Sequence, residues 1–310
     1  MRAVGLTELG AHPRVLELPA PEPVEGELRV RVQAASVNGF DIAVASGRLK
    51  GMMEHRFPVI LGKDFAGTVD ALGPGVTGYS PGERVFGVVV KPYLGDGSFA
   101  EYVTVNASTG IAPLPQKVNF PEGGALGLAG AAAIAAVDAA GLDAGKTVLI
   151  AGATGGVGNQ VIQLAATAGA RVIATVHSTA EKVLVNTLGA SEVVYYMEDI
   201  ATQVLAVHPS GVDVVVHLAG TPAPLLSALR PTGRFVSTIV GSPDQLPSER
   251  AEVVPVYADP TRAILERLAE YQASGRTRVM IQRSYPLDDV PEALADFARG
   301  TLGKLGIVIA

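Results

Sequence analysis

A glycine-rich loop is the segment of this 310-residue chain whose residue types and spacing point most directly to chemistry. It reads AGATGGVG over residues 151–158, between an expected apolar strand, 147–151, and an expected helix, 158–168. In the dinucleotide-binding frame, Ala153 takes the first glycine position, Gly155 the second and Gly158 the third. The small first residue permits a tight turn, Gly155 lets the backbone approach a pyrophosphate, and Gly158 lets the helix pack closely on the strand.

Such a loop also places free backbone N–H groups at the positive end of a helix, where a pyrophosphate binds well. Because strand, loop, helix and second strand follow in the expected order, we predict that this segment binds a dinucleotide. The alternative is a glycine-rich turn without a ligand. The predicted contacts within the loop are Ala153, Thr154, Gly155, Gly156 and Val157.

The residues after the second expected strand, 171–176, bear on which nicotinamide cofactor would bind. An NAD-selective site usually places Asp or Glu there, to accept a hydrogen bond from the ribose 2′-hydroxyl. This chain has His177 and Ser178 instead, followed by Lys182, and its first carboxylate, Glu181, falls inside the next expected helix. Donors and one positive charge suit a 2′-phosphate, so we predict NADPH as cofactor, with His177, Ser178 and Lys182 as contacts. The alternative is that Lys182 is only a solvated helix residue.

Composition excludes several other classes of function. The chain has no Cys, so disulfides, thiolate zinc sites, iron–sulfur clusters and a cysteine nucleophile are all ruled out. A net charge of −6 lacks the basic footprint of a nucleic-acid-binding protein. The five histidines show no metal-ligand spacing, and His217, on an apolar strand, is expected to be a core residue. The longest apolar stretch, 123–137, is judged too short and too rich in Ala and Gly to span a bilayer. The N-terminus lacks the long apolar stretch of a signal peptide, so a cytoplasmic protein is expected.

Two organisational patterns divide the chain. Residues 1–118 read as short strands cut by Gly and Pro, such as 28–35, which alternates polar and apolar residues. From residue 119 onward, strands and helices alternate, which predicts a parallel sheet with helices on both faces. The tail reads strand, helix, strand and is too small to fold alone, so it is expected to return to the N-terminal domain.

Several segments together resemble the medium-chain dehydrogenase/reductase superfamily, in its zinc-independent, zeta-crystallin-like quinone oxidoreductase branch. The resemblance runs nearly end to end. It rests on VNGFD at 37–41, LGKDFAGTV at 61–69, PGERV at 81–85, GSFAEYV at 97–103, the glycine loop, and GKLGIV at 303–308.

The resemblance implies a fold, a reaction and an assembly. A Rossmann doubly wound parallel sheet domain, 119–256, would be inserted into a GroES-like β-barrel substrate domain, 1–118, completed by 257–310. The enzyme would transfer a hydride from NADPH to a quinone or an α,β-unsaturated carbonyl compound. Two copies would pair through the candidate edge strand 253–257; the alternative is a protected edge and a monomeric protein. Further cofactor contacts would fall at Leu218, Ala219, Ser237, Val256 and Ala258.

The resemblance also locates what this chain lacks. Zinc members of the superfamily carry a catalytic Cys near the position of Gly39 and a His-Glu pair where this chain has Lys63-Asp64, so no metal is expected. Asn38 is the leading polar candidate, as a bridge between the nicotinamide and the substrate oxygen; the alternative is an Asn that caps a helix starting near Asp41. Tyr93 is the second catalytic candidate, with an ordinary surface tyrosine as the alternative. Lys63 can face the substrate but is not favoured as a proton donor.

Two departures from the branch leave the substrate open. Ala43 and Ala132 stand where the branch often has Tyr and Thr, which removes two typical polar contacts. An enoyl-thioester reductase of the same superfamily remains an alternative, as does a non-catalytic NADPH-binding structural or sensor protein.

Overall fold

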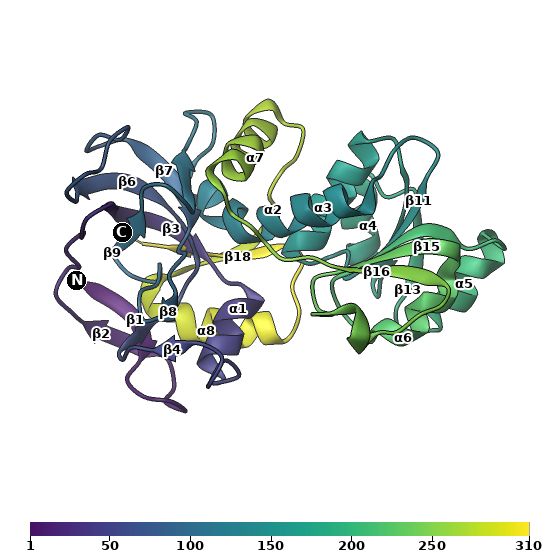
Figure 1. The fold of residues 1–310 in the computed structure, drawn as a ribbon, viewed down its shortest axis with the longest axis horizontal. Helices are drawn as coiled ribbons and strands as arrows, with labels where there is room; N and C mark the ends of the chain where they lie inside the picture. The colour runs from purple at the N-terminus through teal and green to yellow at the C-terminus, as the bar shows by residue number, and fades with distance from the viewer. Residues whose placement is uncertain (310) are drawn as a thin grey trace. The chain divides into compact units, whose positions relative to one another are not determined.

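The computed structural model describes residues 1–309, and the chain divides into two compact units (Figure 1). Unit 1 consists of Met1–Ala129, Pro260–Gly275 and the segment from Ile281 onward; unit 2 consists of Gly130–Asp259 and Arg276–Met280. The sequence suggested boundaries at 118/119 and 256/257. The contacts instead place residues 119–129 with unit 1, because helix α2 (Phe120–Ala140) begins in one unit and ends in the other.

Unit 1 is built from short strands. In its main sheet the order is β10-β7-β6-β3-β18-β17, with β9 also paired to β3; β1 pairs with β2 and β5, and β4 pairs with β8. The C-terminal strand β18 pairs antiparallel with β3, so the tail completes the N-terminal sheet, as its size predicted. The elements of unit 1 are β1 (Arg2–Leu6), β2 (Arg14–Glu17), β3 (Glu27–Ser36), α1 (Gly39–Ala45), β4 (Glu54–His55), β5 (Val59–Ile60), β6 (Asp64–Leu72), β7 (Arg84–Val88), β8 (Tyr93–Leu94), β9 (Tyr102–Asn106), β10 (Ile111–Pro113), α7 (Arg262–Ser274), β17 (Ile281–Pro286), α8 (Val290–Ala298) and β18 (Lys304–Val308).

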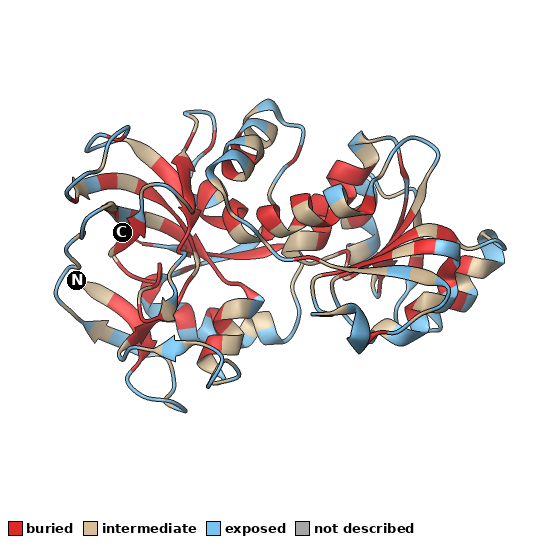
Figure 2. Cartoon of the chain, viewed as in Figure 1, coloured by how far each residue is buried: buried red, intermediate tan, exposed pale blue. Residues whose placement is uncertain are grey.

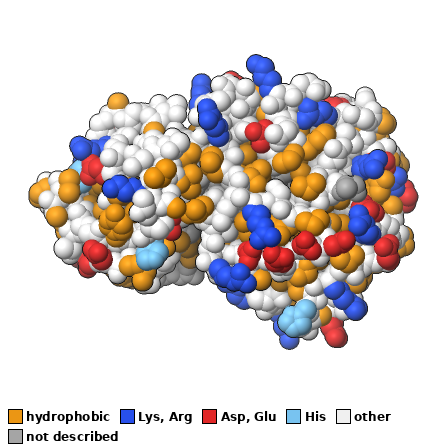
Figure 3. Space-filling view, turned by 180° about the vertical axis from the view of Figure 1, so that it is seen from behind, with side chains coloured by type: hydrophobic (Ala, Val, Ile, Leu, Met, Phe, Trp, Pro, Cys, Tyr) orange, Lys and Arg blue, Asp and Glu red, His pale blue; other side chains and the backbone are white. Residues whose placement is uncertain are grey.

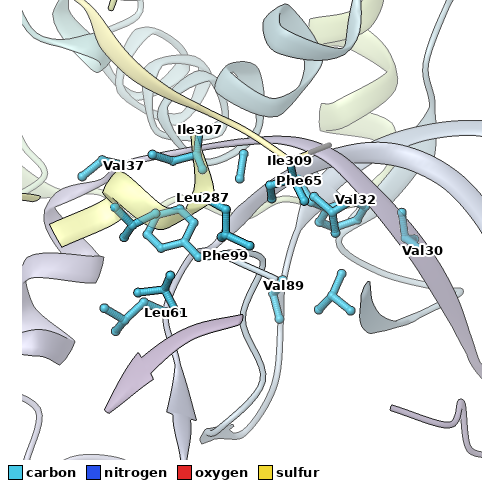
Figure 4. Packing of buried hydrophobic residues seen from close by; sticks show 14 of the residues in the cluster. Val30, Val32, Val37, Leu61, Phe65, Val89, Phe99, Leu287, Ile307 and Ile309 are labelled. Atoms are coloured by element: carbon cyan, nitrogen blue, oxygen red, sulfur yellow. The ribbon is translucent and has the colours of Figure 1, made fainter. Parts of the chain in front are cut away.

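The core of unit 1 follows from the two-residue period of its strands. In β3, Leu28, Val30 and Val32 are buried, while Arg29 and Arg31 between them lie on the other face. Side chains from segments far apart in the sequence, including Phe99, Leu287 and Ile307, meet the same cluster (Figure 4). This packing holds the C-terminal strand against the first third of the chain.

Unit 2 is a six-stranded parallel sheet of order β13-β12-β11-β14-β15-β16. Its central strands β11, β12 and β14 are mainly apolar, as strands covered on both faces must be, and nearly all of their residues are buried (Figure 2). Helices α3 and α4 cover one face, and α5 and α6 cover the other (Figure 1). The elements are β11 (Thr147–Ala151), α3 (Gly156–Thr167), β12 (Arg171–Val176), α4 (Thr179–Thr187), β13 (Glu192–Tyr195), α5 (Ile200–Val207), β14 (Val212–His217), α6 (Pro222–Leu225), β15 (Leu229–Ser237) and β16 (Ala251–Pro255).

Helix α2 corrects one sequence inference. With 21 residues it is long and apolar enough to cross a membrane, so the judgement that this stretch is too short is wrong. Its most apolar window is nevertheless 72% buried, which makes it a core helix. Its small residues permit this packing: a Cβ at Gly124 would lie 2.7 Å from the Ala34 backbone, and one at Gly127 would lie 2.9 Å from a carboxylate oxygen of Asp64.

One further element departs from the expected pattern. The helix expected over 222–229 is only the single turn α6 followed by a short 3₁₀ segment, and β15 already begins at Leu229. On the surface, Lys and Arg side chains are interspersed with Asp and Glu on the face seen in Figure 3. Exposed ion pairs, such as that of Arg283 with Glu292, contribute little to stability.

Candidate functional site

The glycine loop has the geometry that its sequence predicted. Gly152 has φ +90°, a left-handed conformation that makes the tight turn after β11. A Cβ at Gly158 would lie 2.6 Å from the Ala153 carbonyl oxygen and closer still to that of Gly152, so only glycine lets α3 pack here. A Cβ at Gly155 would have no protein atom nearer than 3.7 Å. The space in front of Gly155 is therefore open, although nothing in unit 2 requires glycine to keep it so.

Two polar side chains, neither of them predicted, hold this loop in place. Asn159 on α3 donates from Nδ2 to the carbonyl oxygens of Ala153 (3.2 Å) and Gly155 (2.9 Å). Thr175 on β12 accepts from the Gly152 N–H (3.1 Å) through its hydroxyl, which donates to the Ile150 carbonyl (3.2 Å). Both side chains are nearly fully buried, so the loop is fixed from two neighbouring elements.

A pocket of about 500 Å³ lies at the carboxyl ends of β11, β12 and β14. Strand order reverses between β11 and β14, and ligands of open parallel sheets bind at such a switch point. Of the predicted contacts, Thr154 and Ala219 line the pocket. The full lining is Ala151, Gly152, Thr154, Thr175, Tyr196, Glu198, Asp199, Ile200, Ala201, Ala219, Gly220, Thr221, Pro224 and Leu225.

The end of β12 differs from expectation in one respect. His177 and Lys182 are exposed and Ser178 is half-buried, so all three are accessible, but none lines the pocket. The Ser178 hydroxyl caps α4 by accepting from the Glu181 N–H. The Glu181 carboxylate turns back and accepts from the His177 N–H at 2.5 Å, so a negative charge does lie at the end of this strand. The position of Glu181 inside α4 does not keep its carboxylate away from the end of β12, because a residue in the first helical turn can reach back past the N-cap.

The ends of β14 and β15 are joined by a buried histidine. His217 is fully buried, as expected of a core residue, with Nδ1 2.9 Å from the Ser237 hydroxyl and Nε2 3.0 Å from the Gly220 carbonyl. A carbonyl only accepts, so Nε2 carries the proton and Nδ1 accepts from Ser237. The Ser237 oxygen in turn accepts from the N–H groups of Ile239 and Val240.

Burial lowers the pKa of His217, which favours the neutral ring that this arrangement requires. The predicted contact Ser237 is thus fully buried and holds loops rather than facing outward. Val256 is also buried and donates its N–H to the Ser237 carbonyl, while Leu218 and Ala258 are half-buried.

The predicted catalytic residue Asn38 belongs to a buried polar cluster in unit 1. Its Nδ2 donates to Asp64 (2.9 Å) and to the Ser36 carbonyl (3.3 Å), and its Oδ1 accepts from Lys304 Nζ at 2.5 Å. Both amide hydrogens are therefore used inside the unit, which does not favour the predicted bridge to a nicotinamide. The helix-capping alternative fits the backbone, because Asn38 is the N-cap of α1.

Asp64 and Lys304 form the centre of this cluster. Their ion pair (3.2 Å) is almost entirely buried, and Asp64 also accepts from the Ser36 hydroxyl (2.8 Å) and the Leu128 N–H (2.6 Å). Asp41 lies beside it, 1% exposed, and accepts from the N–H groups of Asn38 and Gly62. Burial raises the pKa of Asp41 to about 7, since its two backbone hydrogen bonds offset only part of the desolvation.

The second predicted catalytic residue, Tyr93, is held by its neighbours. Its hydroxyl donates to Asp96 at 2.8 Å, and the Arg56 guanidinium lies 3.7 Å from its ring centre. Burial and the Asp96 carboxylate raise the pKa of Tyr93. The hydroxyl proton is thus committed to an internal acceptor, and a catalytic role for Tyr93 stays a prediction.

Comparisons with known proteins agree with this architecture. The family described as "Alcohol dehydrogenase GroES-like domain" matches residues 24–116, and "Zinc-binding dehydrogenase" matches residues 156–266. A quinone oxidoreductase from Lama guanicoe is 30% identical over 332 residues, covering 100% of this chain and 98% of its own.

The solved structures that match the whole or nearly the whole chain include two quinone oxidoreductase-related examples. The quinone oxidoreductase from Coxiella burnetii has a TM-score of 0.91 at 26% identity, covering 100% of this chain and 99% of its own. Mycobacterial Rv1454c complexed with NADPH has a TM-score of 0.86 at 28% identity, covering 99% of each chain. The predicted fold class, a Rossmann-type parallel sheet with a GroES-like domain, is confirmed.

Proposed function

We propose a reaction for this chain from one premise: it belongs to the quinone oxidoreductase family of the medium-chain dehydrogenase/reductase superfamily. As an oxidoreductase of this family, it transfers a hydride from NADPH to a quinone or an α,β-unsaturated carbonyl compound. The observation that carries the proposal is the glycine loop, whose turn is fixed by Gly152 and Gly158 and which leaves open space at Gly155. The NADPH complex of the mycobacterial neighbour supports the choice of cofactor.

The residues of unit 2 fit a dinucleotide. The backbone around Thr154 and Gly155, at the N-terminus of the twelve-residue α3, would receive the pyrophosphate, and the pocket beyond it has room for the adenosine half. The Tyr196 ring, 5.5 Å from the His177 ring, offers an apolar wall there. NADPH supplies the hydride; the protein binds it, orients it and excludes water.

The preference for NADPH over NADH rests on the end of β12. Lys182 is exposed and Ser178 is half-buried with its hydroxyl hydrogen not used in capping α4, so both suit a 2′-phosphate. The Glu181 carboxylate opposes this preference, but its charge is partly satisfied by the backbone N–H of His177.

An assay of NADPH oxidation against a quinone, an enone and an enoyl thioester tests the proposal. We expect turnover with the quinone or the enone that survives a metal chelator, and a large fall in the NADPH-to-NADH binding ratio in Ser178→Asp, because a second carboxylate repels the phosphate. Turnover confined to the thioester would favour an enoyl-thioester reductase. NADPH binding without oxidation of any acceptor would contradict the proposed reaction and favour a structural or sensor role.

We also propose that catalysis needs no metal. Within residues 1–309, no group of three His, Cys, Asp or Glu side chains is placed to hold a metal ion. Lys63 and Asp64 stand where the zinc members have His and Glu, and Asp64 already has an internal cation in Lys304. Activity lost to a chelator and restored by zinc would overturn this proposal.

Finally, we propose a cytoplasmic homodimer that acts on small molecules, without nucleic-acid or membrane partners. Strand β16 is the last strand of its sheet, and Val253 and Val254 on it are half-buried, so its free edge suits pairing with a second copy. Sedimentation is expected to give twice the mass of one chain. A monomer at micromolar concentration would contradict the dimer but not the reaction.

A further inference from the structure

The turn that follows β14, residues 218–221, forms part of the wall of the pocket of about 500 Å³ in unit 2. Its residues from Ala219 to Thr221 are exposed, and Gly220 has φ +88°, a left-handed conformation that glycine adopts without strain. The turn leads directly into α6, and together these two segments supply five lining residues: Ala219, Gly220, Thr221, Pro224 and Leu225. Exposed turns are mobile unless something fixes them, so what fixes this one bears on the shape of the pocket.

His217, the last residue of β14, holds this turn from inside the sheet. Its Nε2 donates to the Gly220 carbonyl at 3.0 Å. The turn also lies against the glycine loop, because the Leu218 N–H donates to the Ala151 carbonyl at 2.9 Å. A Cβ at Gly152 would lie only 2.9 Å from that of Ala219. One buried side chain therefore fixes the segment that packs on the tight turn of the glycine loop.

The imidazole ring of His217 has no hydrogen-bonding capacity to spare. Its Nδ1 accepts from the Ser237 hydroxyl, whose oxygen uses both of its lone pairs on the N–H groups of Ile239 and Val240. The groups that face the ring are this hydroxyl, the Gly220 carbonyl and the Phe235 ring, whose centre lies 5.4 Å away, and none of them is charged. Burial lowers the pKa of His217. A neutral ring with its proton on Nε2 is the state that satisfies all of these groups.

Filling the core does not require a histidine at this position. A leucine or a phenylalanine would occupy a fully buried site beside Phe235 without the cost of desolvating two ring nitrogens. The imidazole differs from these side chains because it carries a donor and an acceptor on different sides of one rigid ring. What an apolar residue could not supply is the bond to the Gly220 carbonyl and the bond from Ser237. The role of His217 therefore lies in the backbone segments that it joins.

We propose that His217 is a positioning residue for the dinucleotide: its Nε2–H bond to Gly220 holds the turn 218–221 against the glycine loop, in the arrangement that NADPH binds. This inference rests on the proposed function. The ring is fully buried, so it acts through the turn and not by touching the cofactor. Without the bond, the turn spends only part of its time in this arrangement, and the apparent Kd rises by the inverse of that fraction. The loss of one net hydrogen bond corresponds to about a five- to tenfold change.

Three substitutions at His217 separate its two hydrogen bonds. Glutamine reaches far enough for its amide nitrogen to donate to Gly220, asparagine is one carbon shorter and keeps only an acceptor for Ser237, and leucine keeps neither. We expect the Kd for NADPH, measured by its fluorescence, to rise about five- to tenfold in His217→Leu and His217→Asn, but to stay within about twofold of wild type in His217→Gln. The matched control is His208→Leu, which should bind NADPH as wild type does. His208 is also a hydrogen-bonded histidine of unit 2, but its partner is Glu192 at the start of β13, and it does not line the pocket.

Melting curves of the same preparations without NADPH separate positioning from stability. His217→Gln and His217→Asn each leave one of the two bonds unmade, so both should melt below wild type and close to each other, while only the asparagine variant loses affinity. A His217→Asn protein that binds NADPH as tightly as His217→Gln would overturn this inference alone, as would a His217→Leu Kd within about twofold of wild type. A wild type that does not bind NADPH would overturn the proposed function, and this inference with it.

Discussion

Replacing Lys304 with methionine is expected to lower the free energy of unfolding of unit 1 by about 3–5 kcal/mol, the usual cost of removing one partner of a buried ion pair. Lys304 is 3% exposed and Asp64 is fully buried. Methionine fills nearly the same volume, so little of the loss comes from packing. What remains is a buried carboxylate without its cation and an Asn38 carbonyl without its donor.

A double-mutant cycle isolates the charge from the other contacts. In the double variant with Asp64→Asn, no uncompensated charge is left, so we expect it to lose less stability than the sum of the two single variants. Arg283→Met serves as the control, because its ion pairs with Glu292 and Asp296 are exposed and should contribute less than about 1 kcal/mol. Hydrogen exchange at β3 and β18 amides would locate the effect. A Lys304→Met protein as stable as the control would contradict the assignment.

This pair also shows where inference from the sequence ends. The two residues lie 240 positions apart, and nothing local marks either as half of an ion pair. They meet because β18 pairs with β3 and β3 pairs with β6, a register set by the whole core of unit 1. The sequence could predict that the tail returns to the first unit, since its length forbids independent folding, but not which side chains it delivers.

The glycine loop is the opposite case. Its chemistry depends on backbone conformation over eight consecutive residues, so the residue types alone predict both the turn at Gly152 and the close packing at Gly158. The pocket beyond it needed more than local pattern. Tyr196 and Asp199 follow β13, two strands away from the loop, and only the sheet order brings them to the same cavity.

Glu181 lies between these two cases. The spacing Ser178-x-x-Glu181 is a helix-capping pattern, so its position near His177 could have been read from the sequence. A carboxylate therefore lies at the end of β12, where cofactor preference is decided, although Glu181 itself belongs to the next helix. Local rules therefore sufficed for this residue, whereas Lys304 required the tertiary structure.

The same substitution at two glycines of the loop is expected to have opposite consequences. In Gly158→Ala the new methyl group would lie 2.6 Å from the Ala153 carbonyl oxygen, and closer to that of Gly152, with only backbone atoms available to move. The apoprotein should lose about 2 kcal/mol or more, as overpacked sites do, with a lower thermal midpoint. In Gly155→Ala the new methyl group meets no protein atom within 3.7 Å and φ −76° is allowed for any residue, so the apoprotein should lose only about 1 kcal/mol, the cost of alanine at this helix N-cap.

Although Gly155→Ala should have the smaller effect on stability, it is expected to weaken NADPH binding. Its methyl group would occupy the open space in front of the α3 N-terminus, where the pyrophosphate must approach the backbone. We therefore expect Gly155→Ala to weaken NADPH binding at least tenfold while its thermal midpoint without NADPH falls less than that of Gly158→Ala. A fluorescence titration and a melting curve on the same preparation measure both quantities. If Gly155→Ala binds NADPH as tightly as wild type, the pyrophosphate does not lie against this glycine, and the open space there serves another ligand or none.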